Sequence, residues 1–139
     1  MNGGPAPAFV ITVPARPENV GLVRQALTGV CDALTADPKA TADVRLAATE
    51  ACTNVVVHAY DGAVAGALEV EARPDGNSLE VLVRDRGAGF APHSPARGLG
   101  LGLPLIMALA ESVNVSAGPD GLGTEIVMRF ALDDAGLEA

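Results

Sequence analysis

The chain has 139 residues, of which 49% are hydrophobic and 3% aromatic, and its formal net charge is −8. This length fits one domain whose core is built from alanine, valine, leucine and isoleucine. An acidic chain repels phosphate groups, so nucleic acid and anionic membrane surfaces are unsuitable partners. No segment approaches the ~18 apolar residues of a membrane span and the N-terminus lacks a signal peptide, so we expect a cytoplasmic protein.

Hydrophobic spacing and turn-forming residues predict the secondary structure in chain order. The predicted elements are a strand over 9–13, helices over 17–34 and 40–60, strands over 67–73 and 78–85, a helix over 99–110, and strands over 113–117 and 124–132. We therefore expect an α+β two-layer sandwich, with a mixed, mostly antiparallel sheet and helices on one face. The chain forms one domain over 1–139, with a core over about 9–131 and frayed ends.

The second predicted helix carries a polar pair beside its apolar stripe. Glu50 and Asn54 are one turn apart, so their side chains lie on one face. An amide oxygen is a suitable ligand for Mg²⁺, and a carboxylate one turn away can orient or deprotonate an attacking hydroxyl. The alternative interpretation is a solvated polar face on an amphipathic helix.

An inward-facing acid ends the strand predicted over 78–85. Asp85 lies on the strand face that it shares with Val83, so its carboxylate points toward the core. A buried carboxylate needs a strong donor, and the exocyclic amine of adenine is one. Gly87 and Gly89 follow, and their missing Cβ atoms allow a ligand to approach the backbone. Alternatively, the aspartate caps a turn before a flexible loop.

Alternating glycines precede the third predicted helix. Gly98, Gly100 and Gly102, with Leu101 among them, expose backbone N–H groups at the positive end of a helix, which suits a phosphate. Arg97 is the basic residue next to this segment. Neither the strand before a dinucleotide-binding motif nor the lysine of a P-loop is present. A glycine-rich hinge before a core helix is the alternative.

The last predicted strand begins with an inward-facing hydroxyl. Thr124 shares a strand face with Ile126 and Met128, so its side chain points toward the core. The hydroxyl is therefore a candidate to bond the Asp85 carboxylate or a water held beside it. A single threonine carries little information by itself.

The order and spacing of these motifs resemble the nucleotide-binding motifs of the GHKL ATPase superfamily, which includes gyrase and histidine kinase domains. Within that superfamily, the segments 50–60 and 98–106 are similar to the anti-sigma factor serine/threonine kinases. The resemblance covers about residues 9–131. It implies a Bergerat-type ATP pocket with Mg²⁺ and a homodimer. It also implies a protein that holds a sigma factor inactive and phosphorylates a serine on an anti-sigma factor antagonist.

By position, the resemblance implies a role for each motif residue. Asn54 would bind Mg²⁺, and Glu50 would act as the catalytic base. Asp85 would read adenine with support from Thr124, and Arg24 in the first helix corresponds to a partner-contacting arginine. The remaining ATP-binding positions would be Gly87, Gly89, Arg97, Gly98, Gly100, Leu101 and Gly102.

One departure from the family keeps a second function open. The segment between Gly89 and Gly98 has eight residues, which is shorter than expected for this family. A short cover over the phosphates favours the alternative of a module that binds ATP and a regulatory partner without transferring phosphate. A detached catalytic domain of a histidine kinase is a weaker alternative, because the chain has no room for a dimerisation helix pair with a phospho-accepting histidine.

Overall fold

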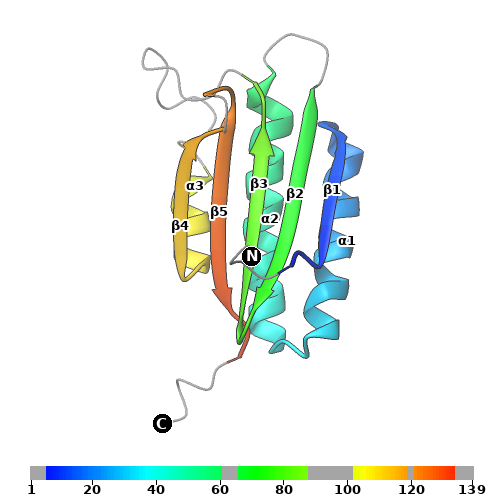
Figure 1. The fold of residues 1–139 in the computed structure, drawn as a ribbon, viewed down its shortest axis with the longest axis vertical. Coiled ribbons are helices and arrows are strands. Elements are labelled where there is room, and N and C mark those ends of the chain that lie inside the picture. Colours follow the sequence, from blue (N-terminus) through cyan, green and yellow to red (C-terminus); the bar gives the residue numbers. More distant parts are fainter. Residues whose placement is uncertain (1–5, 61–65, 88–101, 119–120, 134–139) are drawn as a thin grey trace.

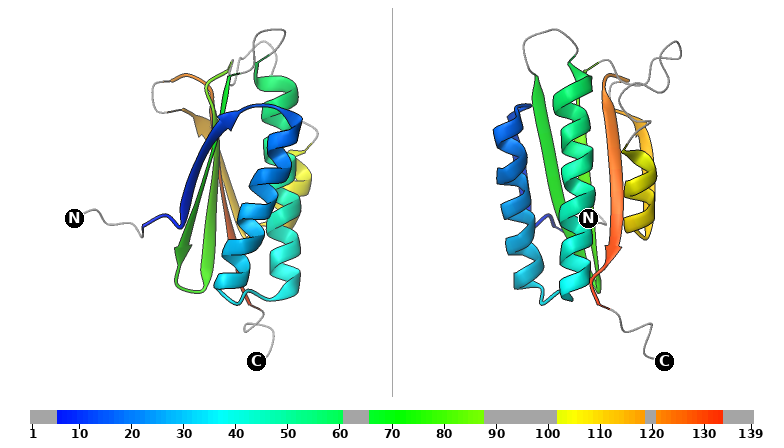
Figure 2. Two further views of the ribbon diagram at one scale, coloured as in Figure 1. Left: turned by 90° about the vertical axis from the view of Figure 1, so that its right-hand side faces the viewer. Right: turned by 180° about the vertical axis from the view of Figure 1, so that it is seen from behind.

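The fold is a layer of helices packed on one face of a five-stranded sheet (Figures 1 and 2). The structure, a computed structural model, describes residues 6–60, 66–87, 102–118 and 121–133. Its elements are β1 (Phe9–Pro14), α1 (Pro17–Ala33), α2 (Pro38–Asn54), the π-helix η1 (Val55–Ala59), β2 (Ala67–Asp75), β3 (Ser78–Asp85), α3 (Leu103–Leu109), β4 (Ser112–Ala117) and β5 (Thr124–Ala131). The predicted α+β sandwich is confirmed.

The sheet is antiparallel throughout the part of the chain that the structure describes. Its strand order is β1-β2-β3-β5-β4, and all four ladders are antiparallel, so the expected mixed sheet is corrected to an antiparallel one. Each connection along the sheet is either a hairpin or a crossing through the helix layer, which places β3 in the middle. The central strand therefore carries its final residue, Asp85, into the interior.

Small side chains allow the helix layer to lie close to the sheet. α1 buries Val23 and Leu27 at helical spacing, and α2 faces the sheet with Ala47, Ala48 and Ala51, each at most 1% exposed. An alanine face brings a helix axis nearer to the strands than a leucine face would, and close packing gains dispersion contacts. The alanine face of α2 thus allows this helix to pack closely against the central strand, β3.

All three α-helices in the described residues differ from their predicted bounds, α1 only in ending at Ala33, one residue early. α2 begins at Pro38, because proline fits the first helical turn, where its missing N–H has no intrahelical acceptor to lose. The prediction of one α-helix to Tyr60 is wrong at its end, where Val55–Ala59 forms a π-helical turn. α3 begins at Leu103, with Gly102 as its N-cap, and the predicted start at Leu99 lies outside the described residues.

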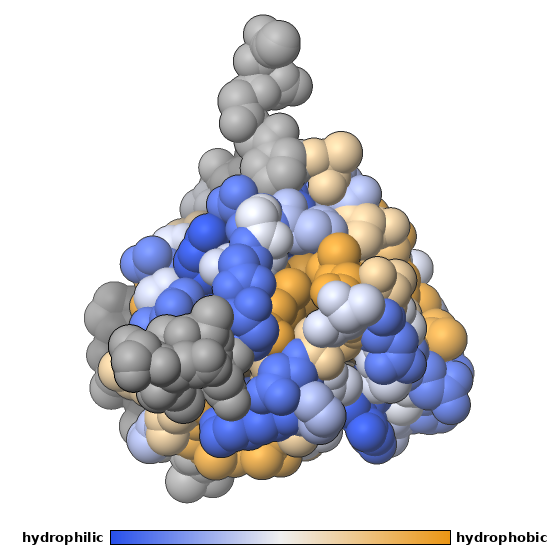
Figure 3. All heavy atoms as spheres, turned by 90° about the horizontal axis from the view of Figure 1, so that it is seen from below, coloured by the Kyte–Doolittle hydropathy of each residue, from blue (hydrophilic) through white to orange (hydrophobic). Residues whose placement is uncertain are grey.

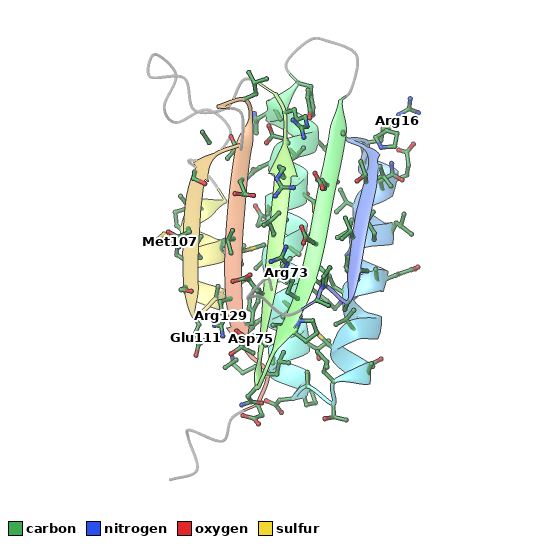
Figure 4. The ribbon with its side chains drawn as sticks, viewed as in Figure 1. Arg16, Arg73, Asp75, Met107, Glu111 and Arg129 are labelled. Carbon is green, nitrogen blue, oxygen red and sulfur yellow. The ribbon has the colours of Figure 1, made fainter. Side chains whose placement is uncertain are left out.

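The sheet face opposite the helices is polar and crossed by ion pairs. Figure 4 places Arg73, Asp75 and Arg129 near one end of the strands. Arg129 Nη2 lies 3.0 Å from Asp75 Oδ2. Arg84 on β3 lies between Glu69 and Glu125, at 3.1 and 2.6 Å. Among the described helices, none has the length and apolar character needed to cross a membrane.

The turn into β5 depends on a glycine in a left-handed conformation. Gly123 has a φ of 74°, and a Cβ there would overlap the backbone of Asp85 and lie 2.6 Å from the Cα of Arg86. Gly121 has a similar φ of 77°, but a Cβ there would meet no described atom within 4 Å. A side chain at either position would adopt an unfavourable backbone conformation, but only a side chain at Gly123 would also clash. Substitutions at the two positions therefore distinguish these two costs.

We expect Gly123→Ala to lower the free energy of unfolding more than Gly121→Ala. The left-handed conformation costs about 1 kcal/mol in both variants, and the clash with β3 adds about 1–3 kcal/mol in Gly123→Ala alone. Urea denaturation of both variants measures the difference. Equal losses would show that the close approach of Gly123 to Asp85 does not constrain the fold.

Candidate nucleotide-binding site

The carboxylate of Asp85 is buried where β3 ends. The residue is 6% exposed, and its Oδ1 accepts a hydrogen bond of 2.8 Å from the Gly87 backbone N–H. A second bond comes from the backbone N–H of Thr124, which pairs with Asp85 in the β3–β5 register. The first residue of β5 thus lies directly opposite Asp85 and supports it through its backbone, and the role of the Thr124 hydroxyl stays a prediction.

Burial raises the pKa of Asp85 above its usual range. Desolvation is the largest cause, and the backbone N–H groups of Gly87 and Thr124 oppose it. The two backbone hydrogen bonds only partly offset the desolvation of this carboxylate, because its charged form remains less favourable here than in water. An additional donor from a ligand would therefore be favourable here.

Gly87 packs against protein backbone. A Cβ on Gly87 would overlap the carbonyl oxygen of Ala59, the last residue of η1. The sequence predicts that this glycine allows a ligand to approach the backbone. The structure adds a second reason for the glycine, the close contact with Ala59, which sequence spacing cannot reveal. The turn after β3 therefore packs directly against the end of η1, the π-helix that follows Asn54.

The end of the glycine-rich segment meets the polar pair of α2. A Cβ on Gly102 would lie 2.7 Å from Glu50 Oε2 and 2.9 Å from Asn54 Nδ2. Residues about fifty positions apart in sequence are thus adjacent in space. The other predicted ATP-binding positions, Gly89, Arg97, Gly98, Gly100 and Leu101, lie outside the described residues.

Asn54 has the properties of a ligand for a shared metal ion. Its Nδ2 is buried without a hydrogen-bond partner among the described residues, and buried polar groups normally have one. Rotation of the amide exchanges nitrogen and oxygen at this place. The described residues contain no group of three or more His, Cys, Asp or Glu side chains that could hold a metal. The buried Asn54 amide, which is unpartnered in the part of the chain that the structure describes, fits a Mg²⁺ ion whose remaining ligands would come from phosphates and water.

Tyr60 is a site residue that the sequence reasoning did not identify. Its Oη donates to the Ala67 carbonyl oxygen at 2.6 Å and accepts from the Arg86 backbone N–H at 2.8 Å. A Cβ on Gly66 would overlap the tyrosine ring. A lone aromatic residue at a helix end has no spacing that predicts such contacts.

Two further features lie away from this site. A cavity of about 230 Å³ opens at the opposite end of the molecule, where Figure 3 shows hydrophobic atoms between polar ones. Its walls include Lys39 and Asp43 from α2 and Leu109 at the end of α3. Arg24, the predicted partner-contacting residue, is half-buried on α1, and its Nε has no partner among the described residues.

The raised pKa of Asp85 predicts a pH-dependent gain in stability for Asp85→Asn without nucleotide. As pH rises above 3.8, the ordinary value, the unfolded chain ionises before the folded one, so wild-type stability falls until the pH exceeds the folded pKa. Asparagine does not ionise. The difference in unfolding free energy should therefore shift in favour of the variant across this window. Denaturation at several pH values measures it, and a constant difference would refute the burial effect.

Comparisons with known proteins show the family to which the chain belongs. Residues 13–130 match the histidine kinase-like ATPase domain family. The serine-protein kinase RsbW of Bacillus licheniformis is 32% identical over 138 residues, which cover 87% of this chain and 86% of the relative. RsbW of Bacillus subtilis is 34% identical over 118 residues, covering 74% of each chain.

A solved structure shares the fold. The crystal structure of the RsbU and RsbW domains of a Mycobacterium tuberculosis protein superposes with a TM-score of 0.69 at 25% identity. The match covers 91% of this chain and 33% of that one, so this chain spans about a third of the longer protein. Together, these relationships confirm the family predicted from the sequence. The chain belongs to the histidine kinase-like ATPase family, within the group of RsbW serine-protein kinases.

Proposed function

We propose that this chain binds Mg²⁺-ATP between α2, β3 and α3, and phosphorylates a serine of an anti-sigma factor antagonist. In the absence of the antagonist, it would hold a sigma factor inactive. The observation that supports this most directly is the approach of Gly102 to Glu50 and Asn54. That approach joins the glycine-rich segment to the polar pair, at the end of the fold where Asp85 is buried.

The adenine end of this proposal depends on Asp85. Its carboxylate is buried with a raised pKa and two backbone donors, and the exocyclic amine of adenine would add a third donor. Guanine carries a carbonyl oxygen at that position, which would face the carboxylate with lone pairs on both sides. A site of this kind discriminates strongly, because the wrong base leaves a buried polar group unpaired.

The phosphate end depends on α2 and Gly102. Asn54 would contribute its amide oxygen to Mg²⁺, which when bound offsets negative charge on the phosphates. Glu50 would accept the proton of the substrate serine hydroxyl as that oxygen forms a bond to the γ-phosphorus. The bond between the γ-phosphorus and the β,γ-bridging oxygen breaks, and ADP leaves. Gly102 keeps the space beside both side chains free.

Protein partners form the regulatory part of the proposal. We place the contact with them on α1, where Arg24 has a buried Nε without a partner among the described residues. Co-precipitation of the sigma factor by wild type and by Arg24→Ala tests this contact, and retained binding would exclude it. We also propose a cytoplasmic homodimer in which 1–139 is one domain, and sedimentation analysis measures the oligomeric state.

Substitution of Glu50 should separate nucleotide binding from phosphoryl transfer. We expect Glu50→Ala to bind ATP nearly as wild type does, and to transfer phosphate about 10²–10⁴-fold more slowly, because it lacks a general base. Labelled ATP and a candidate antagonist supply the assay, with phosphoserine as the product. Thr49→Ala, one residue earlier on α2, is the control. Full transfer by Glu50→Ala would remove Glu50 from the mechanism.

Substitution of Asp85 should weaken ATP binding. We expect Asp85→Asn to lower ATP affinity by a factor of about 10–100, equivalent to ~1–3 kcal/mol, because the new amide presents a donor to the adenine amine. Calorimetric titration measures the affinity, with Asp75→Asn on the open sheet face as the control. An unchanged affinity would refute adenine recognition by Asp85.

A further inference from the structure

The ladder between β2 and β3 ends one pair before its hydrogen-bonding pattern is complete. Asp75 and Ser78 close a two-residue turn, so they form a hydrogen-bonded pair, and every second pair along an antiparallel ladder is of this kind. Counting in steps of two from that pair reaches Ala67 opposite Arg86. The register instead ends at the pair before it, Leu68 with Asp85.

The hydroxyl of Tyr60 takes the place of the missing bond. Its oxygen accepts the Arg86 backbone N–H at 2.8 Å and donates to the Ala67 carbonyl oxygen at 2.6 Å. A direct backbone bond would bring these two groups to about 2.9 Å of each other, whereas a bridging oxygen keeps them further apart. Both backbone groups stay paired, although the two strands diverge beyond Asp85.

The ring of Tyr60 is itself held in place. Gly66 leaves room for it, since a Cβ there would overlap the ring and lie 2.9 Å from its Cδ1. Tyr60 directly follows η1, whose last carbonyl, that of Ala59, packs against Gly87. The end of η1 thus fixes the turn after β3 at two points, through the hydroxyl on Arg86 and the carbonyl on Gly87.

Both points lie next to the proposed adenine contact. The Arg86 N–H directly follows Asp85 in the chain, and the Gly87 N–H is a donor to the Asp85 carboxylate. Removal of the Tyr60 hydroxyl would leave Arg86 N–H and Ala67 C=O to pair with each other or to lose their partner. In either case the strands would change their separation at the residue that carries the carboxylate.

We propose that Tyr60 is a positioning residue for nucleotide-base selection: its hydroxyl bridges β2 and β3 and so sets the place of the Asp85 carboxylate. This inference rests on the proposed role of Asp85 in binding adenine. It assigns to Tyr60 an effect on which purine is bound, beyond its contribution to the fold.

The test compares ATP with inosine triphosphate, which carries a carbonyl oxygen in place of the exocyclic amine. We expect Tyr60→Phe to lower ATP affinity about 5- to 30-fold, the effect of one lost hydrogen bond, and to leave inosine triphosphate affinity nearly unchanged. The readout is the ratio of the affinity for ATP to the affinity for inosine triphosphate. Val30→Ala, half-buried on α1, is the control for a general loss of stability, and its ratio should equal that of wild type.

Asp85→Asn in the same assay separates the two proposals. If Tyr60 acts through Asp85, the ratio falls in each single variant, and Tyr60→Phe causes no further fall when added to Asp85→Asn. A wild-type ratio in Asp85→Asn would overturn adenine recognition itself. If Asp85→Asn has a reduced ratio but Tyr60→Phe keeps the wild-type ratio, adenine recognition stands and only the role of Tyr60 is overturned. Equal losses for both nucleotides in Tyr60→Phe would do the same.

A second variant and a spectroscopic readout cover the case in which Tyr60→Phe does not fold. Gly66→Ala displaces the ring and retains the hydroxyl, so the ratio should fall, and a wild-type ratio would count against the inference. Tyr60 is the chain's one tyrosine, and there is no tryptophan, so tyrosinate absorbance reports on this residue alone. Burial chiefly raises the pKa of Tyr60, and the nearby Asp85 charge adds to it. Asp85→Asn should therefore lower that pKa, and an unchanged pKa would contradict the proximity of the Tyr60 hydroxyl to the Asp85 charge.

Discussion

The site depends on the close approach of backbones at one end of the sandwich. Gly87 lies against the Ala59 carbonyl, and Gly123 lies against the backbone of Asp85. At each of these contacts a Cβ would overlap a main-chain atom, so the elements can meet only where the side chain is missing. The polar groups at this end are therefore placed by main-chain packing between the end of η1, the turn after β3 and the turn before β5.

The burial of Asp85 is a cost to the folded chain that a ligand can offset. Two backbone N–H groups bond the carboxylate, yet desolvation still raises its pKa. A local conflict of this kind, at the end of an otherwise apolar strand face, is typical of a functional position. The same reasoning applies to Asn54, whose buried amide nitrogen has no partner in the described parts of the chain. Under the proposed function, both residues would gain a partner from the nucleotide and its metal ion.

The π-helical turn links these two groups. It begins directly after Asn54 and ends at Ala59, so it carries the chain from the proposed metal ligand to the support of the Asp85 turn. Such turns interrupt regular α-helices and occur frequently at functional sites. In this chain the turn delivers the Ala59 carbonyl and the Tyr60 ring to the end of β3. A regular α-helix over the same residues would point them in other directions.

The sequence by itself determined the order of the elements, the α+β class, the family and the inward direction of Asp85. The elements, the fold class and the direction of Asp85 follow from local periodicity, since side chains alternate along a strand and recur every turn along a helix. The family follows from the resemblance of the motifs, in their order and spacing, to those of known proteins. Only the tertiary structure decided which groups meet: the Thr124 backbone on Asp85, the Ala59 carbonyl on Gly87, and Tyr60 across the end of the ladder. Every residue has a backbone C=O, and every residue except proline has a backbone N–H, so residue type does not predict these backbone contacts. They arise from the packing of segments that are distant along the chain.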